Sequence, residues 1–237
     1  FTTSARRIFD ACCDLTGATS GYVALLSPTG EENEVLFLEA GGLPCTVDPE
    51  LPMPIRGLRA DAYHFKKAVY DNDFSHSKWM EFMPSGHVHL ENVMFAPLVV
   101  DGKAVGLLGV ANKPEPFTDR DAAAAAAFGE LAAIALRNSR TREQLTRSEE
   151  LLSETGRVAR VGGWELDVDA GELRWTDEVR RLHDVAPDYE PQVDTAIDFY
   201  MPEDQPRIRQ AVQSAIEDGK PYDMELRIRT ATGRTRW

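Results

Sequence analysis

Residues 93–113 read VMFAPLVVDGKAVGLLGVANK, which places two runs of apolar residues on either side of Asp101-Gly102. Valine, leucine and phenylalanine favour strands, and Asp-Gly between two such runs is a strong signal for a tight hairpin turn. We therefore predict an antiparallel hairpin with strands at residues 93–100 and 104–110.

A second hairpin is predicted upstream of this one. Residues 21–26 and 34–40 are rich in strand-forming residues, and the turn sequence Ser27-Pro28-Thr29-Gly30 separates them. Apolar residues at helical spacing predict one helix before this hairpin, at 4–15, and another between the two hairpins, at 56–67. This order indicates an α+β fold in which helices flank an antiparallel sheet.

A long helix is predicted from Thr118 to about Leu152, where no proline interrupts the sequence. Four residues of this helix recur every seven positions: Leu131, Asn138, Leu145 and Leu152. This spacing is typical of a two-stranded coiled coil, in which Asn138 would fix the register. We predict a homodimer through these residues. The alternative is that Leu131 and Ile134 only cover the sheet of the first domain.

Short elements follow Gly156. We predict a hairpin at 163–168 and 172–175, helices at 177–183, 195–200 and about 202–218, a strand at 222–230, and a turn into 234–237. These patterns divide the chain into a first domain at residues 1–140, a linking helix at 118–152 and a second domain at 156–237.

The charge of the chain restricts its partners. Asp and Glu number 39 against 26 Lys and Arg, which gives a net charge of −13 and would repel nucleic acids and anionic membranes. No apolar run approaches the roughly 18 residues that span a bilayer, and no signal peptide is recognisable. Three cysteines do not form a disulfide framework. We expect a cytoplasmic fragment of a longer protein, whose membrane contacts, if it has them, lie elsewhere.

The first half of the sequence resembles GAF domains. The resemblance lies in residues 106–113, GLLGVANK, followed by Phe117 and Asp121. In cyclic-nucleotide-binding members the signature ends in Asp-Glu, whereas Asp121 is followed by Ala122. We therefore interpret Lys113 and Asp121 as an ion pair that braces the turn from strand to helix.

The second half resembles PAS domains of sensor kinases. The matching segments are GGWE at 162–165, WTDE at 175–178, PED at 202–204 and GKPY at 219–222, although Met201 stands where most members have histidine. The last, central strand of a PAS sheet would lie beyond Trp237. We therefore expect the second domain to be C-terminally incomplete, to borrow a strand or to continue in a longer protein, with its sheet split into two hairpins.

Together the two resemblances imply a sensory and dimerisation fragment of a signal-transduction histidine kinase. A small-molecule or redox signal in the GAF pocket would be relayed through the long helix. No catalytic domain is recognisable in this chain, so we assign no enzymatic activity to it. A structural dimerisation module without ligand remains an alternative. A cysteine-dependent methionine-sulfoxide reductase is a weaker one, because Cys45 has no evident resolving partner.

The GAF resemblance also implies where the ligand would lie. In this fold the segment between the crossing helix and the second hairpin lines the pocket, and a proline-bearing loop precedes that helix. The binding candidates in these two segments are Cys45, Tyr70, Phe74, Trp79, Met83, His87 and His89. Aromatic and methionine side chains suit a large, flat, apolar ligand.

Haem is one such ligand, and some GAF domains of sensor kinases carry it. Resemblance to those domains implies Cys45 as the thioether residue and His87 or His89 as the axial iron ligand. The ordinary alternative is that Cys45 is a small loop residue and that both histidines lie at the surface.

Overall fold

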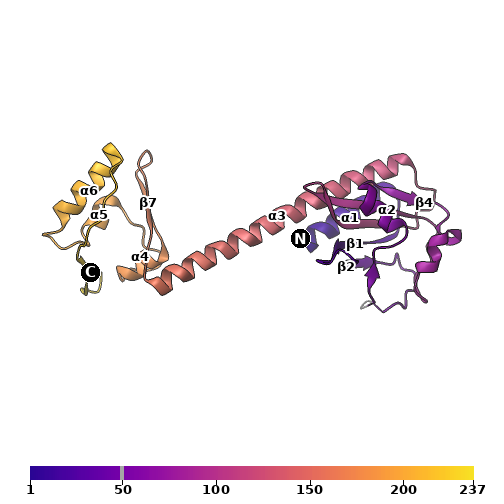
Figure 1. The fold of residues 1–237 in the computed structure, drawn as a ribbon, viewed down its shortest axis with the longest axis horizontal. Helices are drawn as coiled ribbons and strands as arrows, with labels where there is room; N and C mark the ends of the chain where they lie inside the picture. Colours follow the sequence, from indigo (N-terminus) through magenta and orange to yellow (C-terminus); the bar gives the residue numbers. More distant parts are fainter. Residues whose placement is uncertain (49–50) are drawn as a thin grey trace. The chain divides into compact units, whose positions relative to one another are not determined.

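The computed structural model describes residues 1–48 and 51–237, which form two compact units, residues 1–143 (unit 1) and residues 144–237 (unit 2). Both units combine helices with antiparallel strands (Figure 1), as the sequence predicts. Over the residues that are described, no helix has the length and hydropathy needed to cross a membrane.

Unit 1 contains an antiparallel sheet whose described strands follow the order β3-β2-β1-β6-β5-β4. The strands are β1 Ser20–Leu26, β2 Glu32–Glu39, β3 Met53–Pro54, β4 Val69–Asp71, β5 Val93–Val100 and β6 Lys103–Ala111. Both predicted hairpins are confirmed, β1 with β2 and β5 with β6. Asp101 and Gly102 both have positive φ, 49° and 74°, as the tight turn between β5 and β6 requires.

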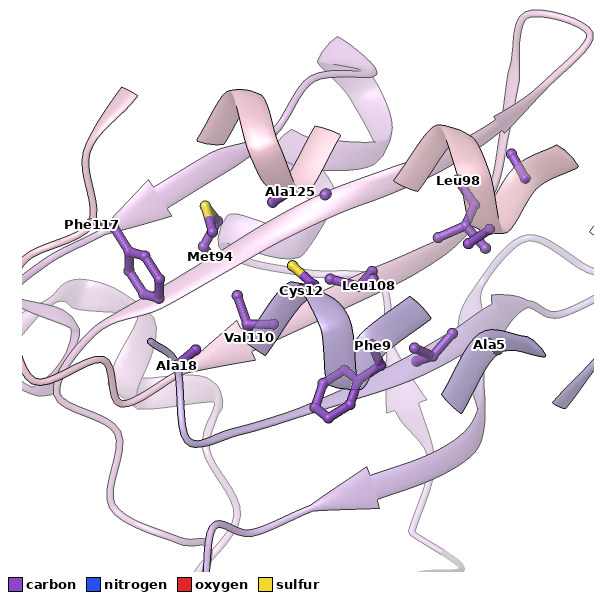
Figure 2. Packing of buried hydrophobic residues seen from close by; sticks show 14 residues of the cluster. Ala5, Phe9, Cys12, Ala18, Met94, Leu98, Leu108, Val110, Phe117 and Ala125 are labelled. Carbon is purple, nitrogen blue, oxygen red and sulfur yellow. The ribbon is translucent and has the colours of Figure 1, made fainter. Parts of the chain in front are cut away.

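Two helices cover one face of this sheet. Helix α1, Thr2–Thr16, and the first part of α3, Asp119–Ala159, bury the main apolar cluster of unit 1. Figure 2 shows Phe9 and Cys12 of α1 and Ala125 of α3 with the strand residues Met94, Leu108 and Val110. Helix α3 approaches β5 closely at Gly129, where an added Cβ atom would lie 2.8 Å from the carbonyl oxygen of Pro97.

The opposite face carries the crossing segment. Helix α2, Leu58–Phe65, is followed by the 3₁₀ helices η1, Phe74–His76, and η2, Lys78–Phe82. Alternation along the strands turns Tyr22, Phe95 and Leu107 toward this side, where they form a second apolar cluster with α2. The sheet is therefore a single layer between two different coverings.

Helix α3 is 41 residues long and extends beyond the predicted end at Leu152. Leu131 and Ile134 are 52% and 48% exposed. The residues of α3 that are buried on unit 1 are Ala125, Gly129, Ala132, Ala133 and Leu136. The interpretation that Leu131 and Ile134 cover the sheet is therefore wrong, because small residues allow the helix to pack closely on its other side.

Unit 2 consists of short elements. They are β7 Trp164–Asp167, β8 Glu172–Trp175, α4 Asp177–Leu182, α5 Val193–Ile197, α6 Gln205–Asp218, β9 Ile228–Arg229 and β10 Thr235–Arg236. Its described strands pair as two separate hairpins, β7 with β8 and β9 with β10, which confirms the predicted split. The strand predicted at 222–230 is mostly wrong: only Ile228 and Arg229 pair as a strand, opposite residues 235 and 236.

One carboxylate holds the last hairpin of unit 2 to the end of α4. Asp184 accepts hydrogen bonds from Thr232, Arg234 and Arg236 at 2.6 to 3.0 Å. Nearby, Trp175 stacks on His183 with a ring-centroid distance of 4.5 Å. The polar cluster connects segments that are far apart in the sequence of unit 2, and the aromatic contact packs β8 against the end of α4.

Candidate functional site

A cavity of about 550 Å³ lies in unit 1, on the face of the sheet that α2 and η2 cover. Strands β1, β2, β5 and β6 line it on one side, and residues 45–48, the start of α2 and residues 79–90 line it on the other. Sites for small molecules and cofactors commonly measure roughly 300 to 1,000 Å³. We call this space the large cavity.

The structure brings most of the predicted binding residues together on this lining. They are Cys45, Phe74, Trp79, Met83 and His87. The other two cysteines, Cys12 and Cys13, belong to α1, which covers the opposite face of the sheet.

Tyr70 and His89 do not line the large cavity. The Tyr70 hydroxyl donates a hydrogen bond to Asp119 in the first turn of α3, at 2.9 Å. His89 Nε2 lies 2.7 Å from an oxygen of Glu91, and both side chains are exposed. Tyr70 belongs to β4, where alternation turns Val69 toward the cavity side and Tyr70 toward the cluster beneath α1 and α3. His89 lies in the irregular segment between β4 and β5, and its side chain is at the surface.

Gly57 allows the aromatic wall of the large cavity to form. It has φ 65° just before α2, and an added Cβ atom would lie 3.2 Å from the Phe82 ring and 3.4 Å from Trp79. Trp79 and Phe82 stack with centroids 6.4 Å apart. Glycine is therefore required here both for backbone conformation and for space.

A backbone hydrogen bond holds the loop that contains Cys45 against the segment that carries His87. The Thr46 N–H donates to the carbonyl oxygen of Gly86 at 2.9 Å. Gly86 has φ 82°, and a Cβ atom there would lie 2.3 Å from the Thr46 hydroxyl oxygen. The close approach of these two segments places Cys45 and His87 on the same lining.

His87 is held in one orientation. Its Nδ1 lies 2.7 Å from the carbonyl oxygen of Val88, and the side chain is half-buried. Because a carbonyl only accepts, Nδ1 carries the proton and Nε2 keeps its lone pair. This is the tautomer that ligates a metal through Nε2.

A polar end of the large cavity, formed by Ser20, Tyr22 and Arg59, was not predicted from the sequence. Within the part of the chain that the structure describes, the buried Ser20 hydroxyl has no hydrogen-bond partner, and the buried Tyr22 hydroxyl makes no hydrogen bond of good geometry but interacts with the Arg59 guanidinium. Burial raises the pKa of Tyr22, and the neighbouring Arg59 guanidinium offsets part of that effect. Strand alternation could have indicated that Ser20 and Tyr22 share one face of the sheet.

Two asparagines connect the lining to the start of α3. Asn112, with φ 55°, donates to the carbonyl oxygen of His89 at 2.9 Å and accepts from the Glu91 N–H at 3.0 Å. Asn92 pairs with both backbone groups of Lys113, at 2.9 and 2.8 Å. The segment with His87 and Leu90 is therefore hydrogen-bonded to the residues that follow β6.

Lys113 extends this series of hydrogen bonds to α3. Its Nζ donates to Asp121 Oδ2 at 2.7 Å, which confirms the ion pair predicted from the sequence. The same oxygen accepts from the N–H and the hydroxyl of Thr118, both at 2.8 Å. Asp121 thus both caps the first turn of α3 and pairs with the residue after the sheet.

A second, much smaller cavity of about 70 Å³ lies in unit 2. Trp164, Trp175, Tyr200 and Tyr222 are among its walls, with aliphatic residues of α5 and α6. Its volume leaves little room for a ligand, so we place the candidate site in unit 1.

Comparison with known proteins agrees with this architecture. Residues 2–137 match the family model described as GAF domain, and residues 172–237 match the one described as PAS fold. Because the first match covers more than half of the chain, this chain belongs to the GAF domain family. It carries a GAF domain followed by a PAS fold, the sensor domains that the sequence resemblance implies.

The curated relatives include proteins named "Blue-light-activated histidine kinase". The one from Brucella ovis is 33% identical over 94 residues, 40% of this chain and 19% of that protein. The one from Brucella anthropi is 34% identical over 91 residues, 38% of this chain and 18% of that protein. The match therefore spans about a fifth of the length of these relatives.

Among solved structures, the GAF domain/HD domain protein from Geobacter sulfurreducens is similar to this chain. Its TM-score is 0.50 at 17% sequence identity, over 59% of this chain and 94% of that one. At this identity the similarity shows the fold alone.

Proposed function

We propose that this chain is the sensory and dimerisation part of a signal-transduction histidine kinase. A small molecule in the large cavity would alter the packing of α3, and α3 would carry the change to the PAS part. Residues 1–140 would then be the ligand-binding domain, 118–152 the relaying helix and 156–237 the next domain. The kinase assignment is supported by the curated relatives and by the order of the GAF and PAS matches.

One observation carries the proposal: β5 and β6 contribute alternate residues to the two faces of the sheet. Phe95 and Leu107 belong to the apolar cluster on the cavity side, whereas Met94 and Leu108 belong to the cluster beneath α1 and α3. Close-packed interiors transmit small displacements, because side chains have little free volume. A shift of these strands around a ligand would therefore reach α3 directly.

The hydrogen bonds of Asn112, Asn92 and Lys113 offer a second connection. They lead from the segment beside His87 and Leu90 to Asp121 in the first turn of α3. A ligand shifts an equilibrium only if it binds one packing of α3 better than another. Contact with the rim segment that Asn112 holds would give the ligand that preference.

We propose that the partner of α3 is the α3 helix of a second copy of this chain. Leu131, Leu145 and Leu152 are exposed, and burying each one in a dimer would contribute about 2 kcal/mol before entropy is subtracted. Asn138 lies at the same seven-residue spacing, where two copies of its amide would face each other. Such a buried polar pair fixes register and strand number.

Native mass spectrometry of the purified chain tests this proposal. We expect the mass of a dimer together with additional mass from a bound small molecule. A dimer that takes up no small molecule from a metabolite extract would support a structural module instead. A monomer at micromolar concentration would contradict the dimerisation part.

A haem-based redox or gas sensor is the second candidate function. It is favoured by the shared position of Cys45 and His87 on the lining and by the free lone pair of His87 Nε2. Cys45 would hold the porphyrin through a thioether and His87 would ligate the iron, while haem would supply the redox or gas-binding chemistry. His89 is not proposed as a ligand, because it pairs with Glu91 at the surface.

Expression with haem supplied tests this second candidate. We expect a Soret band, loss of covalent retention in Cys45→Ser, and a shifted spectrum in His87→Ala. His89→Ala is the matched control and should leave the spectrum unchanged. A protein without a Soret band under these conditions would remove the haem proposal and leave the general ligand proposal standing.

A further inference from the structure

We infer that the polar end of the large cavity, Ser20, Tyr22 and Arg59, binds the anionic group of the ligand. The ligand class is then a monoanionic acid with a flat, mainly apolar body. This inference rests on the proposed function, because it names the chemistry of the ligand of that same cavity.

Two buried hydroxyl groups lie at this end of the large cavity. Ser20 is 1% exposed, and over residues 1–48 and 51–237 its hydroxyl has no hydrogen bond, while the Tyr22 hydroxyl makes none of good geometry and interacts with Arg59. Both residues belong to β1 and are two positions apart, so their side chains share one face of the sheet and line the large cavity. A buried hydroxyl without a partner costs free energy, and a ligand acceptor in the cavity would remove that cost.

The Arg59 guanidinium lies at the same end of the large cavity. Over the residues that are described, no carboxylate lies within 4.0 Å of its guanidinium group, although the side chain is only half-exposed. Arg59 instead interacts with the neutral phenol groups of Tyr22 and Tyr63, which leave its positive charge uncompensated. A half-buried cation without an opposite charge is a site for an anion, because desolvation strengthens the pairing.

Arg56, the other arginine on the lining, is already engaged. Its guanidinium donates to the carbonyl oxygen of Phe82 at 3.2 Å and lies 5.0 Å from the centre of the Phe82 ring. Arg59 is therefore the arginine of the lining that remains available to an anionic group.

The charge of the rest of the lining limits the ligand to a single negative charge. Glu39 and Glu81 also line the large cavity, and Glu39 is paired with Arg6 at 3.6 Å. Acidic groups on the lining would repel a polyanion such as a nucleoside triphosphate more strongly than a monoanion. A neutral ligand, by contrast, would leave Arg59 unpaired. A ligand with one carboxylate or sulfonate at the Arg59 end avoids the repulsion of a polyanion and still pairs with Arg59.

The apolar part of the lining indicates the body of the ligand. Trp79 and Phe82 stack at an interplanar angle of 28°, and Met83, Leu90 and Phe95 add apolar surface. Parallel aromatic side chains favour a flat ring system over a branched aliphatic chain.

Two fluorescent probes that differ only in the anion test this inference with the full chain. The probe 8-anilinonaphthalene-1-sulfonate carries one sulfonate, and N-phenyl-1-naphthylamine is the same molecule without it. We expect the sulfonate to bind more tightly, and Arg59→Gln to weaken its binding by about tenfold without changing the affinity for the neutral probe. Lys67→Gln, which removes a positive charge outside the lining, should change neither affinity.

Tyr22→Phe gives an independent readout because it removes only the hydroxyl. We expect a higher Tm for the ligand-free protein, weaker binding of the sulfonate and unchanged binding of the neutral probe. A structural role of the hydroxyl would instead lower the Tm. Energy transfer to each probe should fall in Trp79→Phe, which places the bound probe in the large cavity.

The outcomes separate this inference from the proposed function. If the neutral probe binds and Arg59→Gln leaves the binding of the sulfonate unchanged, the polar end does not bind an anionic group. The proposal that the large cavity binds a ligand would still stand. If neither probe shows energy transfer from Trp79, the cavity is not a ligand site and both proposals fail.

Discussion

The ammonium group of Lys113 lies 2.7 Å from Asp121 Oδ2, and each of the two side chains is only 13% exposed. Lys113 comes two residues after β6, which lines the large cavity, and Asp121 lies in the first turn of α3. The pair therefore fixes the start of the helix to the end of a strand that contacts the candidate ligand site.

Lys113→Met should destabilise unit 1, because it leaves the buried carboxylate of Asp121 without its cation. We expect the free energy of unfolding to fall by about 2 kcal/mol. Urea denaturation followed by circular dichroism measures this change. Lys103→Met is the matched control: Lys103 is exposed, has no ion pair among the described residues and should cost less than about 0.5 kcal/mol. Equal effects of the two variants would show that the Lys113 pair adds no stability.

Asp184 should make the stability of unit 2 sensitive to acid. The neighbouring hydroxyl groups of Thr230 and Thr232, together with the Arg234 guanidinium, hold the pKa of this carboxyl well below its ordinary value of 3.8. A lowered pKa in the folded state contributes stability that is present above the ordinary value and is lost as the pH falls through the lower, folded value.

We therefore expect unit 2 to lose stability as the pH falls below about 4, and Asp184→Asn to remove this part of the dependence. The variant should also be less stable than the parent at pH 7. Thermal denaturation at a series of pH values measures both effects. Asp188→Asn, at an exposed position, is the control, and an equal change in that variant would rule out a special role for Asp184.

The dimer proposal predicts that Leu145→Lys favours the monomer, because a charge replaces an apolar side chain in the seam between the two helices. Leu151→Lys is the matched control, since Leu151 is 67% exposed and Leu145 is 59% exposed but only Leu145 has the seven-residue spacing. Sedimentation equilibrium should give a dissociation constant at least about tenfold higher for Leu145→Lys than for the control. Equal constants would contradict the proposed seam.

Asn138 should determine the number of helices in the assembly rather than add to its stability. We expect Asn138→Val to raise the Tm of the assembly and to broaden its oligomeric state beyond dimers, because a buried amide costs stability but enforces register. Multi-angle light scattering after size exclusion reports the mass distribution. A less stable and purely dimeric variant would show that the amide is not buried between helices.

Asn112→Gly should separate ligand binding from its transmission. Glycine keeps the left-handed backbone conformation at φ 55° while removing the hydrogen bonds to His89 and Glu91. We expect the affinity for N-phenyl-1-naphthylamine to change by less than about threefold. The change that this probe causes in the hydrogen–deuterium exchange of α3 should disappear. A normal effect on α3 would mean that the packed sheet alone carries the coupling.

The sequence predicts the elements of this fold where the signals are local. Asp101-Gly102 and Ser27–Gly30 determine their hairpins through the turn itself, and Lys113 with Asp121 is recognisable as a spaced pair. The strand predicted at 222–230 is mostly wrong because a strand exists only where another segment pairs with it. Among the described residues, the partners of this segment are residues 235 and 236 and a single bridge from Tyr200 to Ile228.

The candidate site is predicted less completely, for a related reason. Trp79, Met83 and His87 stand out by their chemistry and lie on the lining of the large cavity. Ser20 and Arg59 are ordinary surface residue types, and their importance depends on neighbours that are distant in sequence. Tyr70 faces away from the cavity because it pairs with Met94 of β5 and packs against the same cluster beneath α1 and α3.

Hydrogen–deuterium exchange of α3, with and without saturating N-phenyl-1-naphthylamine, tests the central claim most directly. The full chain would be measured at a concentration where it is dimeric, with occupancy of the large cavity verified by energy transfer from Trp79. We predict that binding changes the exchange rates of amides in residues 125–150, which do not line the large cavity. Saturated binding with unchanged exchange along this stretch would contradict the account.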